Sequence, residues 1–312
     1  MIETVVSVNL PAGGHLKVMK NVLAPSADAG CGKRVCIATG IHGDELEGQY
    51  VCYELNRLIQ EQPGCLTGTV ELYPALNPLG VDSVTRGIPG FDLDMNRIFP
   101  GEEEVSPPEY IAHRVMESMK GADLCIDIHA SNIFLREIPQ VRMTKETEET
   151  LLPYARLLNV DYIWISSAAT VLESTLSCSL NRMGIPTLVV EMGVGMRITE
   201  GFCRQLTEGI LALLKSMGIW QGTVITPREP VVSKDRRVEE IYAGKPGIFI
   251  PCAMHWSAVG KGALLGRIVD PLEGCVEEEV YAPMEGRLFT LREYPVVSQG
   301  SLLARILGGA DA

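Results

Sequence analysis

The sequence is poor in positive charge and has no long apolar run. Its 312 residues hold 27 Lys and Arg against 39 Asp and Glu, which gives a formal net charge of −12. This surplus of negative charge argues against nucleic acid and anionic membranes as partners. No apolar stretch reaches the length of a membrane span. The first residues also lack the basic start and apolar run of a secretory signal. We therefore expect a cytoplasmic protein.

Paired cysteine motifs are missing as well. The nine Cys are an odd number and are scattered along the chain without a CxxC pair. This pattern favours buried, reduced thiols over a disulfide framework. The content of 46% hydrophobic and 21% charged residues is typical of a globular protein. A chain of 312 residues can form one large domain or two unequal ones.

Up to about residue 225, apolar runs of strand length alternate with stretches of helical periodicity. After a β-hairpin at 4–20, the pattern predicts strands at 34–40, 68–78, 124–131, 161–166 and 185–193. It predicts helices at 45–62, 106–121, 146–158, 172–184 and 199–218, and a long loop at 79–101. Such alternation predicts an α/β domain over 1–225, with a largely parallel sheet and helices on both of its faces.

The pattern changes in residues 226–312, which we call the tail. A polar segment with two prolines, 226–237, reads as a linker, and short β-like runs follow it. The run 262–268 is echoed by 300–306, and a glycine that opens an apolar run precedes each copy, at Gly247 and Gly286. Two similar β-units in tandem predict a small pseudo-symmetric sandwich or barrel.

Two histidines and a glutamate suggest a metal site. His42 and Glu45 are three residues apart where a strand gives way to a helix, and His129 ends a later strand. Catalytic zinc takes three such nitrogen and oxygen ligands and keeps its fourth position open. A lone HxxE is more often a solvated first helical turn, but the second histidine favours zinc. Asp127 shares a strand face with His129. It could orient the site or be a plain strand-end acid.

Glu191 directly follows the apolar run TLVV at a predicted strand end. A carboxylate in such a place is costly unless it has a partner or a role. The functional interpretation is a general base and acid that handles the protons of the reaction. The alternative is a salt-bridged strand terminus. His42, His129 and Glu191 thus all follow strand ends, where ligands bind in open α/β sheets.

The long loop carries three candidates for anion binding, Arg86, Asn96 and Arg97. Arginine grips carboxylates through paired N–H groups, and asparagine adds amide donors. In an acidic protein, two arginines beside a predicted metal site suggest a clamp for an anionic substrate. The alternative is a set of ordinary loop charges paired with Asp92 and Asp94.

Four segments carry a family resemblance: HGDE at 42–45, DMNRIFPG at 94–101, DIH at 127–129 and VEMG at 190–193. In this order, with Arg86 ahead of the second segment, they resemble the succinylglutamate desuccinylase/aspartoacylase family of the zinc carboxypeptidase-like superfamily. The similarity covers about 30–220. It implies a three-layer αβα zinc-peptidase-like domain with a mostly parallel mixed sheet, followed by a smaller all-β domain that covers or flanks the active site.

The resemblance also implies roles for individual residues. One zinc per chain would be held by His42, Glu45 and His129, with Glu191 as the catalytic carboxylate and Arg86 steadying the oxyanion. Asn96 and Arg97 would hold the carboxylate of the amino-acid part of the substrate. Arg197, shortly after Glu191, is a candidate for reading a side-chain carboxylate.

We therefore expect a zinc-dependent amidohydrolase that removes an N-acyl group from a small, anionic N-acylated amino acid. The alternative is a zinc metallocarboxypeptidase that acts on short peptides, but a tail packed over the cleft would favour the smaller substrate. The loop between Arg86 and Asn96 looks longer than in aspartoacylases, and the tail resembles that of relatives that deacetylate N-acetylated diamino acids. A homo-oligomer is compatible with this interpretation.

Overall fold

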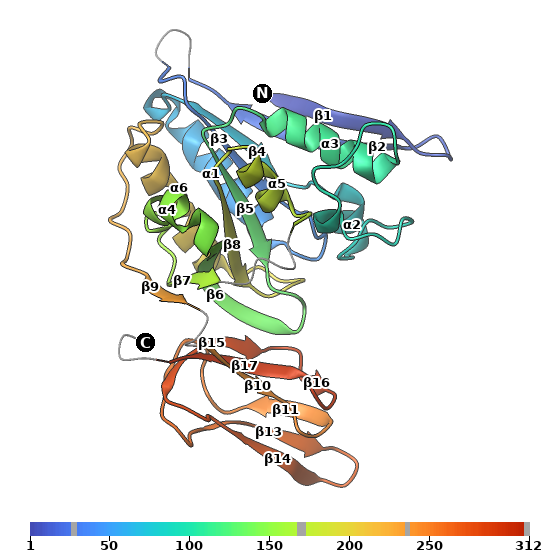
Figure 1. Ribbon diagram of the computed structural model, residues 1–312, viewed down its shortest axis with the longest axis vertical. Helices are drawn as coiled ribbons and strands as arrows, with labels where there is room; N and C mark the ends of the chain where they lie inside the picture. Colours follow the sequence, from blue (N-terminus) through green and yellow to red (C-terminus); the bar gives the residue numbers. More distant parts are fainter. Residues whose placement is uncertain (26–29, 167–172, 235–237, 309–312) are drawn as a thin grey trace.

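The computed structural model describes residues 1–25, 30–166, 173–234 and 238–308 (Figure 1). It is a mixed α/β structure with a large sheet and a second, smaller sheet. The strands up to residue 234 are β1 Ile2–Asn9, β2 His15–Leu23, β3 Arg34–Thr39, β4 Thr69–Tyr73, β5 Leu124–Ala130, β6 Leu135–Thr144, β7 Tyr162–Ser166, β8 Thr187–Gly193 and β9 Val231–Lys234. The helices are α1 Glu47–Glu61, α2 Pro78–Ser83, α3 Pro107–Met119, α4 Lys145–Ala155, α5 Leu176–Arg182 and α6 Glu200–Ser216, with 3₁₀ turns η1 Pro63–Cys65 and η2 Met95–Arg97. None of the helices in these ranges is long and apolar enough to cross a membrane.

Parallel strands form the centre of the large sheet, which begins in the order β1-β2-β4-β3-β5-β8-β6. The strands β4, β3, β5 and β8 are parallel to one another, whereas β6 is antiparallel to β8. The carboxyl ends of β3, β5 and β8 therefore meet at one edge of the sheet (Figure 1). The prediction of an α/β fold with a mixed sheet is confirmed. The parallel pairs lie at the centre, and β1-β2, β2-β4 and β6-β8 are antiparallel.

Two apolar cores explain why the central strands read as continuous apolar runs. Along β3, Val35 and Ile37 enter a core shared with α1, α4 and α6. Their neighbours Cys36 and Ala38 enter a different core, shared with α3 and α5. Successive side chains of a strand point to opposite faces, so a strand buried on both faces must be apolar at nearly every position.

The structure differs from the predicted elements in several segments. The strand β6 was not predicted, and the loop 79–101 contains α2 and η2. The segment 226–237 contains β9, which pairs with β7, although residues 235–237 lie outside the described ranges. The helix predicted at 172–184 is seen only as α5, and residue 172 also lies outside the described ranges. The helix predicted from 45 begins at Glu47, so Glu45 precedes it.

The tail repeats one strand pattern twice. After β9, its strands are β10 Val238–Tyr242, β11 Gly247–Pro251, β12 Ala258–Val259, β13 Leu264–Asp270, β14 Cys275–Tyr281, β15 Gly286–Arg292, β16 Val296–Val297 and β17 Leu302–Leu307. The neighbours β12-β15-β17-β10 and β16-β11-β13-β14 follow equivalent orders. The repeated sequences thus form equivalent strands, and Gly262 and Gly300 precede them with φ of 81° and 82°. Glycine adopts this left-handed conformation without steric cost.

The large sheet does not end where the tail begins. The strand β15 pairs with β6, and β17 and β10 follow it, so strands from both parts of the chain form one 13-stranded sheet. The tail strands β14, β13, β11 and β16 form the separate four-stranded sheet, which lies at the lower end of the molecule in Figure 1.

Candidate metal centre and active site

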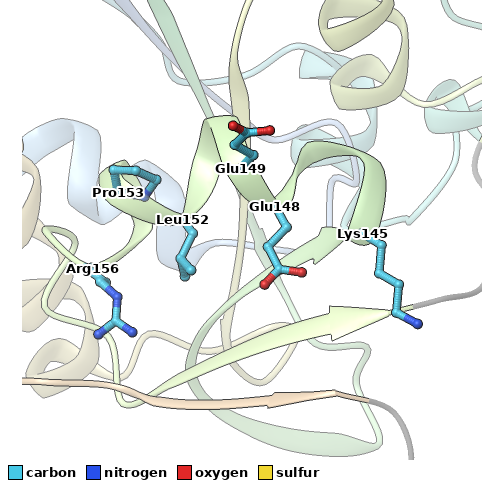
Figure 2. Close-up of a pocket in the computed structure, with 6 residues that line it drawn as sticks. All are labelled: Lys145, Glu148, Glu149, Leu152, Pro153 and Arg156. Atoms are coloured by element: carbon cyan, nitrogen blue, oxygen red, sulfur yellow. The ribbon is translucent and has the colours of Figure 1, made fainter.

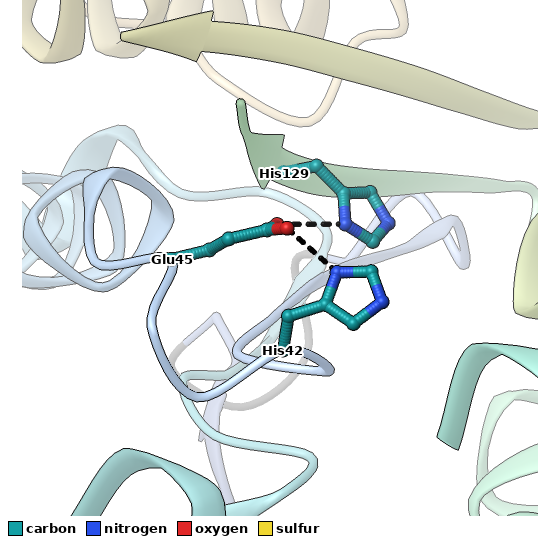
Figure 3. A group of neighbouring side chains, drawn as sticks. All are labelled: His42, Glu45 and His129. Atoms are coloured by element: carbon teal, nitrogen blue, oxygen red, sulfur yellow. Dashed lines mark hydrogen bonds and ion pairs between the residues drawn. The ribbon is translucent and has the colours of Figure 1, made fainter. Parts of the chain in front are cut away.

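The three candidate metal ligands lie together in a buried cluster (Figure 3). The Nδ1 atom of His42 is 2.7 Å from Glu45 Oε1, and the Nδ1 atom of His129 is 3.0 Å from Glu45 Oε2. The donor atoms of the three residues all lie within 4.8 Å of one another. Two imidazole nitrogens and one carboxylate are a donor set that suits zinc. The residues present therefore fit the predicted ion.

A tight turn, rather than a helical turn, brings His42 and Glu45 together. Both residues precede α1, and the Glu45 N–H donates to the His42 carbonyl over 3.3 Å. The intervening Gly43 lies against α2, where a Cβ atom would come within 1.9 Å of the Gly80 carbonyl carbon. Only glycine permits that close approach. The two candidate ligands are therefore aligned by a turn that precedes α1 and not by a helical turn.

A carboxylate contacts the outer nitrogen of each histidine. Asp94 Oδ1 lies 3.1 Å from His42 Nε2, and Asp127 Oδ2 lies 3.2 Å from His129 Nε2. Partners of this kind fix the tautomer and orientation of a metal-binding imidazole. The contact of Asp127 is an ion pair without hydrogen-bond geometry, and its closeness to His129 supports the orienting role over a plain strand-end acid. Sequence reasoning missed the part of Asp94, although the residue opens the recognised segment 94–101.

The charges of the cluster favour a cation. Burial opposes the charged form of His42, but Asp94 and Glu45 outweigh it and raise its pKa. Burial also opposes charge on Glu45, yet the two histidines lower its pKa to about 2. At His129, burial is outweighed by Asp127 and Glu45, which raise its pKa well above its usual value. Three carboxylates thus surround two imidazoles, which is a suitable environment for a divalent ion.

Glu191 stands beside the cluster on β8, where it pairs in register with His129 of β5. Its carboxylate is largely buried, and Oε1 lies 3.4 Å from Nη1 of Arg142 on β6. Burial raises the pKa of Glu191, and Arg142 opposes this rise. The residue therefore has a salt bridge, as the alternative interpretation expected, and it also lies next to the predicted metal ligands.

The structure brings Arg86 to the cluster. Its Nη1 lies 3.2 Å from Glu45 Oε1, and its Nη2 lies 3.5 Å from Asp94 Oδ2. About 43% of the Arg86 side chain is exposed. It lines a depression of about 580 Å³ formed by residues of the loop 85–94. The lining also includes Asp94, which contacts His42, but it includes neither the three candidate metal ligands nor Glu191.

The contacts given for Asn96 and Arg97 are with backbone groups and not with the candidate metal ligands. Asn96 is buried, and its Oδ1 accepts a hydrogen bond from the Leu176 N–H that helps to position α5. Arg97 is exposed and donates to the Asn96 carbonyl over 2.8 Å. Arg197 is exposed in the loop after β8. Substrate contacts by these three residues stay predictions.

A second surface depression, of about 530 Å³, lies on α4 and is open to solvent (Figure 2). Its lining residues are Lys145, Glu148, Glu149, Leu152, Pro153 and Arg156. They include none of the candidate site residues, so we assign no substrate to this surface.

A model of the succinylglutamate desuccinylase/aspartoacylase catalytic domain matches residues 31–217, more than half of the chain. This stretch contains both histidines, Glu45 and Glu191. The chain belongs to the succinylglutamate desuccinylase/aspartoacylase family. The family predicted from the four sequence segments is confirmed.

Relatives of this family resemble the chain over nearly its whole length. The N-alpha-acetyl-L-2,4-diaminobutyric acid deacetylase of Halomonas elongata is 24% identical over 287 residues, which cover 89% of this chain and 82% of that protein. The succinylglutamate desuccinylase/aspartoacylase structure from Rhodobacter sphaeroides has a TM-score of 0.81 at 23% identity and covers 98% of this chain and 95% of its own. The product-bound ectoine utilization protein EutE (DoeB) from Ruegeria pomeroyi has a TM-score of 0.82 at 21% identity and covers 98% and 94%. The tail is therefore part of the shared fold.

Proposed function

We propose that this protein is a zinc-dependent amidohydrolase that removes the N-acyl group from a small N-acylated amino acid. The observation that carries the proposal is the buried cluster of His42, Glu45 and His129 with Glu191 in register beside it. Membership of the family and the deacetylase name of the Halomonas elongata relative support a deacylation reaction.

Each residue has a chemical task in this proposal. His42 and His129, through Nδ1, and Glu45 would hold the ion. When bound, zinc polarises an acyl carbonyl and makes water acidic enough to ionise near pH 7. Glu191 takes the proton of the attacking water and delivers it to the leaving amine. The raised pKa of Glu191 suits this exchange, because a general base works best when its pKa approaches the operating pH.

Arg86 would donate to the oxygen on which negative charge develops, from its place beside Glu45. Asn96 and Arg97 would bind the carboxylate of the amino-acid part, and Arg197 remains a candidate for a side-chain group. The substrate class proposed is therefore a small anion, with N-acetylated diamino acids among the compounds to test because of the relative's name.

We further infer a three-layer αβα catalytic domain over 1–225 and a β-rich domain over 226–312 that flanks the active site. The two apolar cores on opposite faces of β3 and the separate core of the tail support this division.

A hydrolysis screen tests the function. The zinc-loaded enzyme is offered N-acetyl, N-succinyl and N-formyl amino acids, N-acetylated diamino acids and blocked dipeptides, with chelator-treated enzyme as the control. We expect release of the free amino acid from one N-acyl class, and loss of this activity after chelation. Preferred cleavage of the dipeptides would instead indicate a metallocarboxypeptidase. Equal activity of the chelated enzyme would overturn the zinc mechanism.

A further inference from the structure

A row of polar residues crosses the junction between the first part of the large sheet and the tail. Glu137 on β6 pairs in register with Thr290 on β15, and Thr290 pairs with Arg305 on β17. Arg305 in turn pairs with Glu240 on β10. Directly opposed residues of antiparallel strands have their side chains on the same face. The register therefore aligns these four side chains across the junction.

The tail supplies two donors to the Glu137 carboxylate, which is 1% exposed. The Thr290 hydroxyl donates to Glu137 Oε2 over 2.6 Å, and Arg305 Nη1 lies 3.0 Å from Glu137 Oε1. Gln140, from β6 itself, donates to Oε2 over 2.9 Å. A buried carboxylate needs such partners, because an uncompensated charge in the interior is very costly. Both oxygens of Glu137 are thus fixed from the tail side.

Arg142 connects the Glu137 carboxylate to Glu191 in the candidate active site. A bulge lies between Glu137 and Gln140, after which Gln140 pairs in register with Glu191. Arg142 places Nη2 3.3 Å from Glu137 Oε1 and Nη1 3.4 Å from Glu191 Oε1. One guanidinium therefore spans the buried carboxylate and the proposed general base.

Both arginines lie near the same aromatic ring. The guanidinium carbon of Arg142 lies 5.6 Å from the centre of the Trp164 ring, and that of Arg305 lies 5.8 Å from it. Stacking on an aromatic ring restricts a guanidinium to a narrow range of positions. Trp164 thus helps to hold both cations in place.

We propose that Glu137 and Arg305 are positioning residues for Glu191 and act through Arg142. This inference rests on the proposed role of Glu191. With Glu137 held by the tail, Arg142 gives one nitrogen to each carboxylate, and Glu191 stays oriented beside His129. Without Arg305, the buried charge of Glu137 is under-compensated and draws Arg142 away from Glu191. The catalytic part of the chain therefore depends on a tail residue that does not touch the substrate.

The internal repeat offers a matched control. Arg267 is the counterpart of Arg305 in the first copy, on the equivalent strand β13. Like Arg305, it pairs through Nε with a glutamate of the neighbouring strand, here Glu279 at 3.4 Å. Among its described contacts, no residue of the active site takes part. The Arg267 side chain is 48% exposed and that of Arg305 is 18% exposed. A change at Arg267 therefore removes an arginine and its ion pair from the tail without the connection to Glu191.

The experiment compares Arg305→Met, Arg305→Lys and Arg267→Met as zinc-loaded, folded enzymes on the best substrate of the wild type. For Arg305→Met we expect kcat to fall on the order of 10- to 100-fold, the effect of misplacing a catalytic group. KM should change little, because Arg305 does not bind substrate. Arg305→Lys should recover part of kcat, and Arg267→Met should match the wild type. Full kcat in Arg305→Met would overturn the proposal.

A double-mutant cycle separates positioning from a general structural effect. In an Arg142→Met background, Arg305→Met should lower kcat no further, since the connection is already broken. Multiplicative losses in kcat would contradict the proposal.

Urea unfolding gives a measurement that is independent of activity. It compares the free energies of unfolding of Glu137→Gln, Arg305→Met and the double variant, and we expect the two single losses to be non-additive. If the wild type hydrolyses no N-acyl amino acid while this coupling is present, the proposed function fails and the network stands. Additive unfolding free energies would overturn the network.

Discussion

Replacing Asp127 by asparagine should weaken zinc binding more than the same change at Asp94. Each acid contacts the Nε2 atom of one histidine, at 3.2 Å for Asp127 and 3.1 Å for Asp94. The two pairs differ in their access to water: the Asp127 side chain is 2% exposed and that of Asp94 is 26% exposed. Asparagine has nearly the same shape but removes the negative charge, so the comparison isolates electrostatics.

The expected magnitude follows from this difference in burial. Removing a carboxylate behind a metal-binding histidine typically costs about 10- to 100-fold in metal affinity. For Asp127 we expect the upper end, about 2.8 kcal/mol, because water barely screens a charge so deeply buried. For Asp94 we expect about tenfold or less, since solvent weakens its interaction. An asparagine there can also still accept the hydrogen bond from the Asn96 N–H that Asp94 now accepts.

Competition with a chromophoric chelator of known zinc affinity measures both variants against the wild type. Circular dichroism and thermal unfolding of the metal-free proteins serve as controls that the fold is intact. Wild-type affinity in folded Asp127→Asn, or an equal loss in both variants, would refute the reasoning from burial.

Three further outcomes test the individual roles. His129→Ala should lose most of the zinc that the wild type holds at about one ion per chain, and undiminished zinc by metal analysis would disprove the ligand assignment. Glu191→Gln should still bind zinc and keep its fold, but its kcat should fall by about 10²- to 10⁴-fold, because the amide cannot accept the proton of the water. Near-normal turnover of the zinc-loaded variant would contradict this role. Arg86→Ala should lower kcat by about 10²- to 10³-fold, whereas Arg97→Ala should mainly raise KM, the sign of lost ground-state binding. Steady-state kinetics that show the same change in both arginine variants would refute the proposed carboxylate clamp.

The meeting of His129 and Glu191 was predictable because the strands that carry them are apolar at nearly all their other positions. The ends of such strands stand out when a histidine or a glutamate follows. His129 and Glu191 occupy such ends, and parallel strands bring their carboxyl ends to one edge of a sheet. The closeness of these two candidate residues could thus be inferred without knowledge of the strand order.

The strand β6 could not be predicted because its sequence breaks the usual pattern. It contains Pro139 and several polar residues that the structure buries wholly or partly, among them Glu137, Gln140 and Arg142. Proline within a strand argues against a central position, and here it lies at the bulge between Glu137 and Gln140. These polar residues contact one another within β6, and their other partners lie on β7, on β8 and in the tail. A single sequence gives no sign of these partners. Arg142, the partner of Glu191, was missed for that reason.

Stability alone gives no reason for the Glu137 network. Removing a carboxylate from water costs free energy that its partners at best offset, and well-packed apolar residues of similar volume are often as stable or more so. A junction of apolar residues would therefore have joined β6 to β15 equally well. With an apolar junction, Glu191 would be the one carboxylate partner of Arg142 within this network. Both guanidinium nitrogens of Arg142 could then bind Glu191 and neutralise the proposed general base. If Glu191 is the general base, as proposed, the buried charge of Glu137 serves to orient Glu191 through Arg142. It does so only while Thr290 and Arg305 of the tail hold the Glu137 carboxylate in place.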